Sequence, residues 1–288
     1  MTIEDRRRFY AEEIGAVAGI QTPGLVDAYA KVPREHFLGP GPWKIGVSDI
    51  GAQSGVSYRL TGDADPRHLY HNVLVSIDPE RQLNNGHPST LAAWIDAVAI
   101  HAGAHVLHIG CGLGYYTAVM AEVAGENGRV IAVEVDASLA ARARENLAPW
   151  KNVEAIAGDG GEFDPGDVDV ILVNAGVTHP NPLWLDRLRP GGRLLFPLTF
   201  ETGGGIGKGC MVLVKRAGDA YSATVVNIVM IFSCTSLRDS TLNGAILKAL
   251  SGGKMSTVQS LRRDAHAAAD TCWFHGASFC LSTIQVAG

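Results

Sequence analysis

The chain has 288 residues, of which 47% are hydrophobic and 18% charged, and its formal net charge is -5. This length is sufficient for one complete α/β core with additions, and the negative charge gives no reason to expect a nucleic-acid partner. The five cysteines are odd in number and form no Cys-x-x-Cys pair, so neither a disulfide scaffold nor a structural zinc site is expected. No run of about 18 apolar residues and no secretory leader occurs, which predicts a cytoplasmic protein without a membrane span.

The N-terminal hundred residues are predicted to be helical with one long loop. Apolar residues among charges indicate an amphipathic first helix, and Thr22 and Pro23 fit the N-cap and first position of a second one. The loop is rich in Gly, Pro, Ser and Asp. In chain order we expect helix 3–18, a helix from Pro23 to about Lys31, loop 39–67, strand 72–77 and a helix from about Ser89 to Ile100.

From residue 105 onward, apolar runs that fit buried strands alternate with segments of helical periodicity. The expected strands are 105–109, 129–135, 153–157, 168–173, 192–198, 210–215 and 223–232, with helices at 115–124, 137–147 and near 182–188. Strands that alternate with helices form a parallel sheet, and the last two apolar runs, with no helix between them, form an antiparallel hairpin. We therefore predict an α/β fold with a doubly wound, mostly parallel seven-stranded sheet and an antiparallel C-terminal hairpin.

The last fifty residues are expected to add a helix at 237–250 and one late strand at 271–282. No internal repeat or linker divides the chain. The organisation predicted is one domain with additions: a helical and loop region on the substrate side (1–80), a nucleotide-binding core (81–236) and a C-terminal extension packed on it (237–288).

One glycine-rich turn organises the core. Residues 106–118 read VLHIGCGLGYYTA, which is a strand, a turn containing Gly110, Gly112 and Gly114, and the start of a helix. Such a unit lets the backbone approach a nucleotide at a helix N-terminus. The spacing is G-x-G-x-G, whereas dinucleotide sites have G-x-G-x-x-G, and the turn holds no basic residue. A nucleoside with an amino-acid tail, S-adenosylmethionine, therefore fits better than NAD, which remains an alternative.

Three polar residues follow the next strands at the sheet edge where such folds bind ligands. Glu134 is placed to accept both ribose hydroxyls, Asp159 to accept from the adenine amino group, and Asn174 to face the same crevice. The alternatives are a solvent-facing acid for Glu134, a turn-forming residue for Asp159 and a helix cap for Asn174. The predicted cofactor site also includes the neighbouring positions His108, Cys111, Tyr115, Val135, Gly158 and Gly160.

At this point the sequence resembles a known family. GCGLGYYTA is similar to the G-x-G-x-G-Y-x-T-A signature of protein-L-isoaspartate O-methyltransferases, and VPREHF at 32–37 resembles their V-P-R-E-x-F motif. GDG at 158–160, DVDVILVNAG at 167–176 and LRPGGRLLFPL at 188–198 match in order and spacing. The resemblance, from Val32 to about Thr235, implies a Rossmann-like methyltransferase. It implies that S-adenosylmethionine is bound by Gly110, Gly112, Gly114, Glu134 and Asp159, beside a pocket shaped by Tyr115, and is released as S-adenosylhomocysteine.

The chain departs from the family pattern in the segment that contacts the methyl acceptor. The family carries T-I-S-Q-P, whose serine and glutamine neighbourhood meets the cofactor and the isoaspartyl carboxylate, whereas residues 84–88 read NNGHP. The proline aligns with Pro88, so Gly86 replaces the serine and His87 the glutamine. Asn85, Gly86 and His87 are the candidate acceptor-side residues. Ser89 could supply a hydroxyl unless it caps the following helix.

The nature of the acceptor decides what His87 must do. A carboxylate is ionised near neutral pH and needs no base, whereas an alcohol or amine would need one, supplied by His87, His68, His71 or His179. The first hypothesis is methyl transfer to a carboxylate of a peptide or protein. The alternatives are a diverged enzyme acting on a small molecule or a dedicated peptide, and a cofactor-binding adaptor without catalysis.

Overall fold

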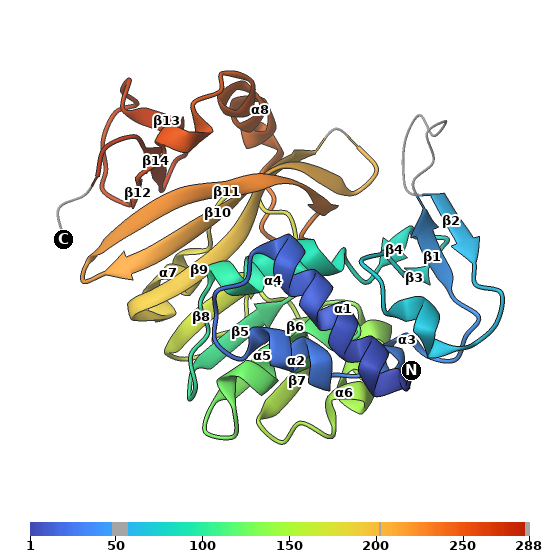
Figure 1. Cartoon of the computed structure of the whole chain (residues 1–288). Coiled ribbons are helices and arrows are strands. Elements are labelled where there is room, and N and C mark those ends of the chain that lie inside the picture. The colour runs from blue at the N-terminus through green and yellow to red at the C-terminus, as the bar shows by residue number, and fades with distance from the viewer. Residues whose placement is uncertain (48–56, 202, 286–288) are drawn as a thin grey trace. The chain divides into compact units, whose positions relative to one another are not determined.

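The computed structural model describes residues 1–47, 57–201 and 203–285 (Figure 1). Two compact units can be distinguished. The first unit consists of Met1–Gly103, Cys111–Val130 and Asp136–Ala155, and the second of Ala104–Gly110, Ile131–Val135 and Ile156–Gly288.

The first unit is mainly helical. Its helices are α1 (Ile3–Ala18), α2 (Leu25–Lys31), α3 (Arg34–Leu38), α4 (Pro88–Ala97), α5 (Tyr115–Ala124) and α6 (Ala137–Leu147). A capping box fixes the start of α1, because the Thr2 side chain accepts from the Asp5 N–H and the Asp5 carboxylate accepts from the Thr2 N–H. Helix α1 packs against α2 and α4, α2 against α5, and α3 against α6. Helix α5, which follows the glycine-rich turn, thus packs against α2.

The start of the second helix differs from the prediction. Helix α2 begins at Leu25 after Gly24 in a left-handed conformation, so Thr22 is not its N-cap and Pro23 is not its first residue. The Thr22 N–H instead donates to the Asp96 carboxylate and the Thr22 hydroxyl donates to the Asp96 carbonyl. A contact with a residue far along the chain therefore overrides the local capping signal.

Two small hairpins complete the first unit. The antiparallel pairs are β1 (Lys44–Val47) with β2 (Ser57–Leu60), and β3 (Ser76–Asp78) with β4 (Leu83–Asn84); a 3₁₀ helix, η1, covers Pro66–Leu69. The prediction of a loop at 39–67 was wrong for β1 and β2, while residues 48–56 lie outside the described residues. Strand β1 forms because Trp43 and Ile45 bury their side chains with Leu69 and Val75.

The main sheet has ten strands, in the order β13-β14-β12-β11-β10-β9-β8-β5-β6-β7. Its strands are β5 (His105–Ile109), β6 (Arg129–Glu134), β7 (Val153–Ala157), β8 (Val168–Val173), β9 (Leu188–Glu201), β10 (Ile206–Ala217), β11 (Ala220–Phe232), β12 (Ser260–Arg262), β13 (Cys272–His275) and β14 (Cys280–Ser282). Strand β8 is parallel to β5 and β9, and β9, β10 and β11 are antiparallel. The seven predicted strands and the closing hairpin are confirmed.

The C-terminal extension continues this sheet. Strands β12, β13 and β14 follow the long β10–β11 hairpin, as the orange and red segments of Figure 1 show. The prediction of one strand at 271–282 was wrong, because the chain reverses at Gly276 and forms the antiparallel β13–β14 pair. Helix α8 (Asn243–Ser251) begins later than predicted, after a 3₁₀ turn, η2, at Ser240–Leu242. Phe274, Phe279 and Leu281 join the core of the second unit.

Helix α7 (Pro182–Arg187) covers the predicted segment near 182–188, and its Trp184 is fully buried in the same core. Within the described residues, no helix combines the length and the apolar character needed to cross a lipid bilayer.

Candidate active site

The glycine-rich turn starts in the second unit at Gly110. Its N–H donates to the Val133 carbonyl, and the Asn174 N–H donates to the Ile109 carbonyl, each over 2.8 Å. Gly110 has a φ of +72°, and a Cβ there would lie 3.2 Å from the Asn174 carbonyl oxygen. Glycine is therefore required where the turn leaves β5.

The rest of the turn belongs to the first unit. Gly112 has a φ of +57°, and nothing lies within 4 Å of a Cβ added there, so there is space beside its Cα. Gly114 is the N-cap of α5, and a Cβ there would lie 2.8 Å from Leu147 of α6. The turn thus combines an accessible glycine with a tightly packed one at a helix N-terminus, whose first N–H groups lack intrahelical partners.

Tyr115, from the glycine-rich motif, packs against the VPREHF segment. Its ring packs edge-on against Phe37 of the VPREHF segment at a centroid distance of 5.6 Å and against Tyr29 at 6.3 Å. Both Tyr115 and Cys111 are buried in the first unit. The VPREHF segment therefore supports the helix that follows the glycine-rich turn.

In the second unit, the ends of β6 and β7 carry the predicted acidic residues. Glu134 is 7% exposed, and its carbonyl accepts from the Gly158 N–H over 2.9 Å. The next side chain, Val135, is 51% exposed. A Cβ at Gly160 would lie 2.4 Å from Ile109 of β5, so close packing requires glycine at this position.

Asp159 stabilises a turn, which is the role predicted for it as the alternative to adenine binding. One carboxylate oxygen accepts from the Gly161 N–H and from the Ser236 hydroxyl, each over 2.8 Å. The Thr235 hydroxyl lies 3.5 Å from the other oxygen. Since a carboxylate has about four acceptor positions, this turn role is compatible with a further hydrogen bond to a ligand.

Asn174 is held by His108. The Asn174 Nδ2 lies 2.8 Å from His108 Nε2 in the second unit. Burial lowers the pKa of His108 to about 3, so the ring is neutral and its Nε2 accepts from the amide. Asn174 Oδ1 is buried and has no hydrogen-bond partner among the described residues. Asn174 is not a helix cap, because Asn181 caps α7 by accepting from the Leu183 N–H.

His108 makes stability depend on pH. The folded chain keeps the ring neutral to a pH of about 3, whereas the unfolded chain protonates it near the ordinary pKa of 6.5. The His108 contribution is therefore complete above pH 6.5 and is lost as pH falls, by about 1.4 kcal/mol per pH unit. In urea titrations between pH 7 and 5, His108→Gln should remove this slope and the exposed His101→Gln should keep it. Parallel profiles for His108→Gln and wild type would contradict the assignment.

The acceptor-side segment is anchored within the first unit. Asn85 pairs with Val75 through two hydrogen bonds, of 2.9 Å from the Val75 N–H to its Oδ1 and of 3.0 Å from its own N–H to the Val75 carbonyl. The Gly86 carbonyl accepts from the Tyr116 hydroxyl of α5 over 3.1 Å, and Gly86 has a φ of +76°. The NNGHP segment thus lies against the helix of the glycine-rich turn.

A hydroxyl lies next to His87. The N-cap position of α4 is His87 itself, so Ser89 is not a cap. Ser89 Oγ accepts from Asn72 Nδ2 over 3.0 Å and lies 3.2 Å from His87 Nδ1. The direction of this second hydrogen bond depends on the tautomer of His87: if the hydroxyl donates to Nδ1, the ring proton is on Nε2, and if Nδ1 donates, the hydroxyl keeps its own proton for a further acceptor. Burial and then the charge of Arg34 lower the pKa of His87, which favours the neutral ring.

Arg34 is a supporting residue that the sequence analysis missed. Its fully buried guanidinium donates to the carbonyls of Leu69 (2.5 Å), His71 (3.1 Å) and Val73 (2.7 Å). These carbonyls flank Asn72, which holds Ser89. The available signal was the arginine of the VPREHF motif, since a buried arginine normally satisfies several acceptors.

The other candidate bases have different surroundings. His68 Nε2 is 2.8 Å from the Asp63 carboxylate, and His71 is exposed. His179 belongs to the second unit, where its Nδ1 is 3.0 Å from the Thr178 hydroxyl. In the first unit, neither the His68 nor the His71 side chain has a hydrogen bond to Asn72, Ser89 or His87 among those described.

Solved structures establish the class of fold. The chain aligns with a protein-L-isoaspartate O-methyltransferase at a TM-score of 0.57, with 21% identity over 84% of this chain and 69% of that one. It aligns equally, at 0.57, with a Plasmodium falciparum structure described as a putative protein-L-isoaspartate O-methyltransferase in complex with S-adenosyl-L-homocysteine. Identity there is 18%, over 80% of this chain and 98% of that one. The fold is therefore the Rossmann-like fold of S-adenosylmethionine-dependent methyltransferases.

The sequence then identifies the family. Residues 63–236, more than half of the chain, match the model of Protein-L-isoaspartate(D-aspartate) O-methyltransferase (PCMT), and the chain belongs to this family. The resemblance noted in the sequence is thus confirmed. VPREHF and residues 237–288 lie outside the matched range.

Curated relatives agree with this assignment. A Thermotoga maritima protein-L-isoaspartate O-methyltransferase is 32% identical over 62% of this chain, which spans only about half (51%) of that relative. The Ignicoccus hospitalis enzyme of the same name is 28% identical over 70% of this chain and 85% of its own length.

Proposed function

We propose that this chain is a methyltransferase that transfers a methyl group from S-adenosylmethionine to a carboxylate of a peptide or protein, with an isoaspartyl residue as the first candidate. The observation that carries the acceptor assignment is the Ser89 hydroxyl beside His87, held by Asn72. It offers a hydroxyl where the family's serine is missing from the NNGHP segment. We place the activity in a reducing cytoplasm, in keeping with five free cysteines.

The residues present fit S-adenosylmethionine. Gly112, two residues before the N-cap of α5, has space beside its Cα, and Glu134 is a buried strand-end acid suited to ribose hydroxyls. Asn174 Oδ1 is a buried acceptor that needs a donor. When bound, the cofactor would supply a methyl group already activated as a sulfonium. The chain's own task is then to align the acceptor, which is catalysis by positioning.

A carboxylate acceptor suits the state of His87. The lowered pKa of His87 favours the neutral ring, and the single hydrogen bond between His87 and Ser89 leaves one proton of the pair for a further acceptor. This donor, on His87 or on Ser89, can orient a carboxylate that is already ionised near neutral pH and therefore needs no base. The same neutral ring could also accept a proton from a hydroxyl, so a small-molecule or dedicated peptide acceptor is the second candidate.

Methyl transfer to matched peptides tests the proposal. The full chain with methyl-labelled S-adenosylmethionine should form a base-labile methyl ester on an isoaspartyl peptide, and none above background on the peptide with ordinary aspartate. His87→Gln should retain activity within about tenfold, because the glutamine amide still donates a hydrogen bond. A general-base role would instead lower kcat by about 100-fold or more.

Other outcomes separate the alternatives. No ester on the isoaspartyl peptide, with S-adenosylhomocysteine formed from an alcohol or amine acceptor, would replace the proposal by the second candidate. Binding of S-adenosylhomocysteine in a calorimeter without turnover of any acceptor would indicate an adaptor that has lost catalysis.

A further inference from the structure

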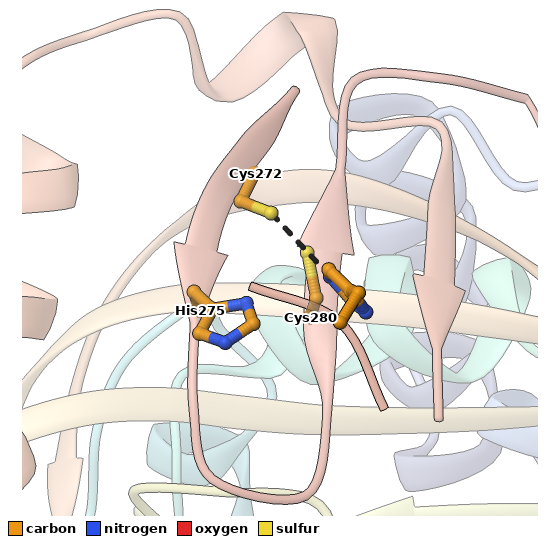
Figure 2. A group of neighbouring side chains, drawn as sticks. Cys272, His275 and Cys280 are labelled. Carbon is orange, nitrogen blue, oxygen red and sulfur yellow. Dashed lines mark hydrogen bonds between the residues drawn. The ribbon is translucent and has the colours of Figure 1, made fainter. Parts of the chain in front are cut away.

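Four side chains with metal-binding atoms meet at the end of the C-terminal extension. Cys272 and His275 lie on β13, Cys280 on β14, and His266 in the segment before β13. Their candidate ligand atoms all lie within 4.8 Å of one another. Figure 2 shows the labelled Cys272, His275 and Cys280 on adjacent strands with their side chains gathered together. We call these four residues the Cys₂His₂ cluster.

His266 is turned inward from an otherwise exposed segment. Of residues 263–270, His266 is the one that is not exposed. Its Nε2 lies 3.5 Å from Cys272 Sγ, and its ring centroid lies 4.9 Å from that of His275. No apolar side chain of comparable size accompanies it in this alanine-rich stretch, so hydrophobic burial does not explain its position.

The rest of the ring of His266 is arranged as in known metal sites. Its Nδ1 lies 2.9 Å from the Asp264 carbonyl and 3.3 Å from the Asp264 carboxylate. A ligating histidine commonly donates its second nitrogen to a carbonyl or carboxylate, which fixes the ring and leaves the other nitrogen for the metal. Asp264 is in turn paired with Arg262.

His275 contributes an unexplained buried nitrogen. Its Nδ1 is buried and finds no hydrogen-bond partner among the described residues. Such a group is costly to bury unless it binds something. Cys280, its cross-strand partner, is fully buried, and all the cysteines of the chain are free thiols.

We propose that His266, Cys272, His275 and Cys280 bind one Zn²⁺ ion as a structural site. Two sulfur and two nitrogen ligands are a set typical of zinc, and four protein ligands leave no position open for catalysis. Zinc–ligand distances of about 2.0–2.3 Å require the ligand atoms to approach one another by about 1 Å from their widest separation. On binding, both thiols lose their protons to solvent and coordinate as thiolates.

The site would secure a part of the chain that has little core of its own. Strands β12, β13 and β14 contain three or four residues each. Phe274 and Leu281 anchor β13 and β14 in the core, whereas the 263–270 segment has no such anchor. Short elements of this kind are commonly stabilised by a metal. The expectation of no zinc site rested on the missing Cys-x-x-Cys pair, and the spacing here is His-x₅-Cys-x₂-His-x₄-Cys.

Metal content of the full chain tests the proposal. Purified protein should contain about one zinc per chain, and the reduced metal-free chain should recover one equivalent when ZnCl₂ is added. Cobalt substitution should give the visible absorption of a tetrahedral ion and a thiolate-to-cobalt band in the near ultraviolet. Cys272→Ser and His266→Ala should each lower the affinity by at least tenfold, whereas Cys234→Ser, outside the cluster, should keep it unchanged.

The circular dichroism spectra and melting temperatures of the metal-free variants should equal those of the metal-free wild type. This control separates loss of zinc binding from loss of fold. His266→Cys provides a second check, since a thiolate can replace an imidazole ligand and should restore binding relative to His266→Ala. A reduced chain that binds no zinc, or variants that retain full affinity, would overturn the proposal. So would a Cys272–Cys280 disulfide whose reduction does not create zinc binding.

Discussion

Replacing Arg34 by alanine is expected to lower the free energy of unfolding by about 3–5 kcal/mol. The guanidinium is fully buried and donates to the carbonyls of Leu69, His71 and Val73. Its removal leaves these carbonyls short of donors and opens a space beside Tyr10, whose ring lies 5.8 Å from the guanidinium carbon. Each unsatisfied buried group costs about 1–3 kcal/mol, and cavities add to this cost.

Urea unfolding followed by circular dichroism measures the loss. The matched control is Arg8→Ala, because Arg8 is half exposed and its ion pairs with Glu12 and Asp27 are worth below about 1 kcal/mol. Arg34→Ala should also speed amide hydrogen exchange in residues 69–73 and 85–89, because the arginine fixes the segment that contains Asn72. A loss below about 1 kcal/mol, or exchange unchanged in both segments, would contradict this role.

The sequence predicted the sheet better than the additions around it. Strands β5, β7 and β8 and helices α5 and α6 agree with the expected ranges: Gly110 and Gly158 directly follow β5 and β7, and Asp136 is the N-cap of α6. The β1–β2 hairpin was missed because Trp43 and Ile45 are buried against residues far along the chain. No local pattern records such a contact.

In the candidate site, too, the parts fixed by a local pattern were predicted, and the parts that depend on contacts between distant segments were not. The positive φ values of Gly110, Gly112 and Gly114 follow from a motif that can be read in one stretch of sequence. The network of Asn72, Ser89 and His87 forms where the segment between η1 and β3 meets the N-terminus of α4, and Arg34, which supports it, comes from a third segment. The Cys₂His₂ cluster likewise needs the reversal at Gly276, which the sequence analysis interpreted as one continuous strand.

Glu134 is expected to be the residue on which cofactor affinity depends most. The residue is 7% exposed at the end of β6, where the fold class binds ribose hydroxyls. Hydrogen bonds to a charged group contribute about 1.5–3 kcal/mol, more than bonds between neutral groups. Glutamine preserves the shape of the side chain but removes the charge and replaces one acceptor oxygen by a donor.

Glu134→Gln should therefore weaken the binding of S-adenosylhomocysteine by about 10–100-fold, since 1.4 kcal/mol corresponds to a tenfold change in Kd. Isothermal titration calorimetry of the full chain measures this change, and an unaltered melting temperature of the ligand-free variant shows that the fold is intact. Glu126→Gln, at an exposed position after α5, is the matched control and should bind like wild type. An unchanged Kd for Glu134→Gln would remove ribose recognition from this carboxylate.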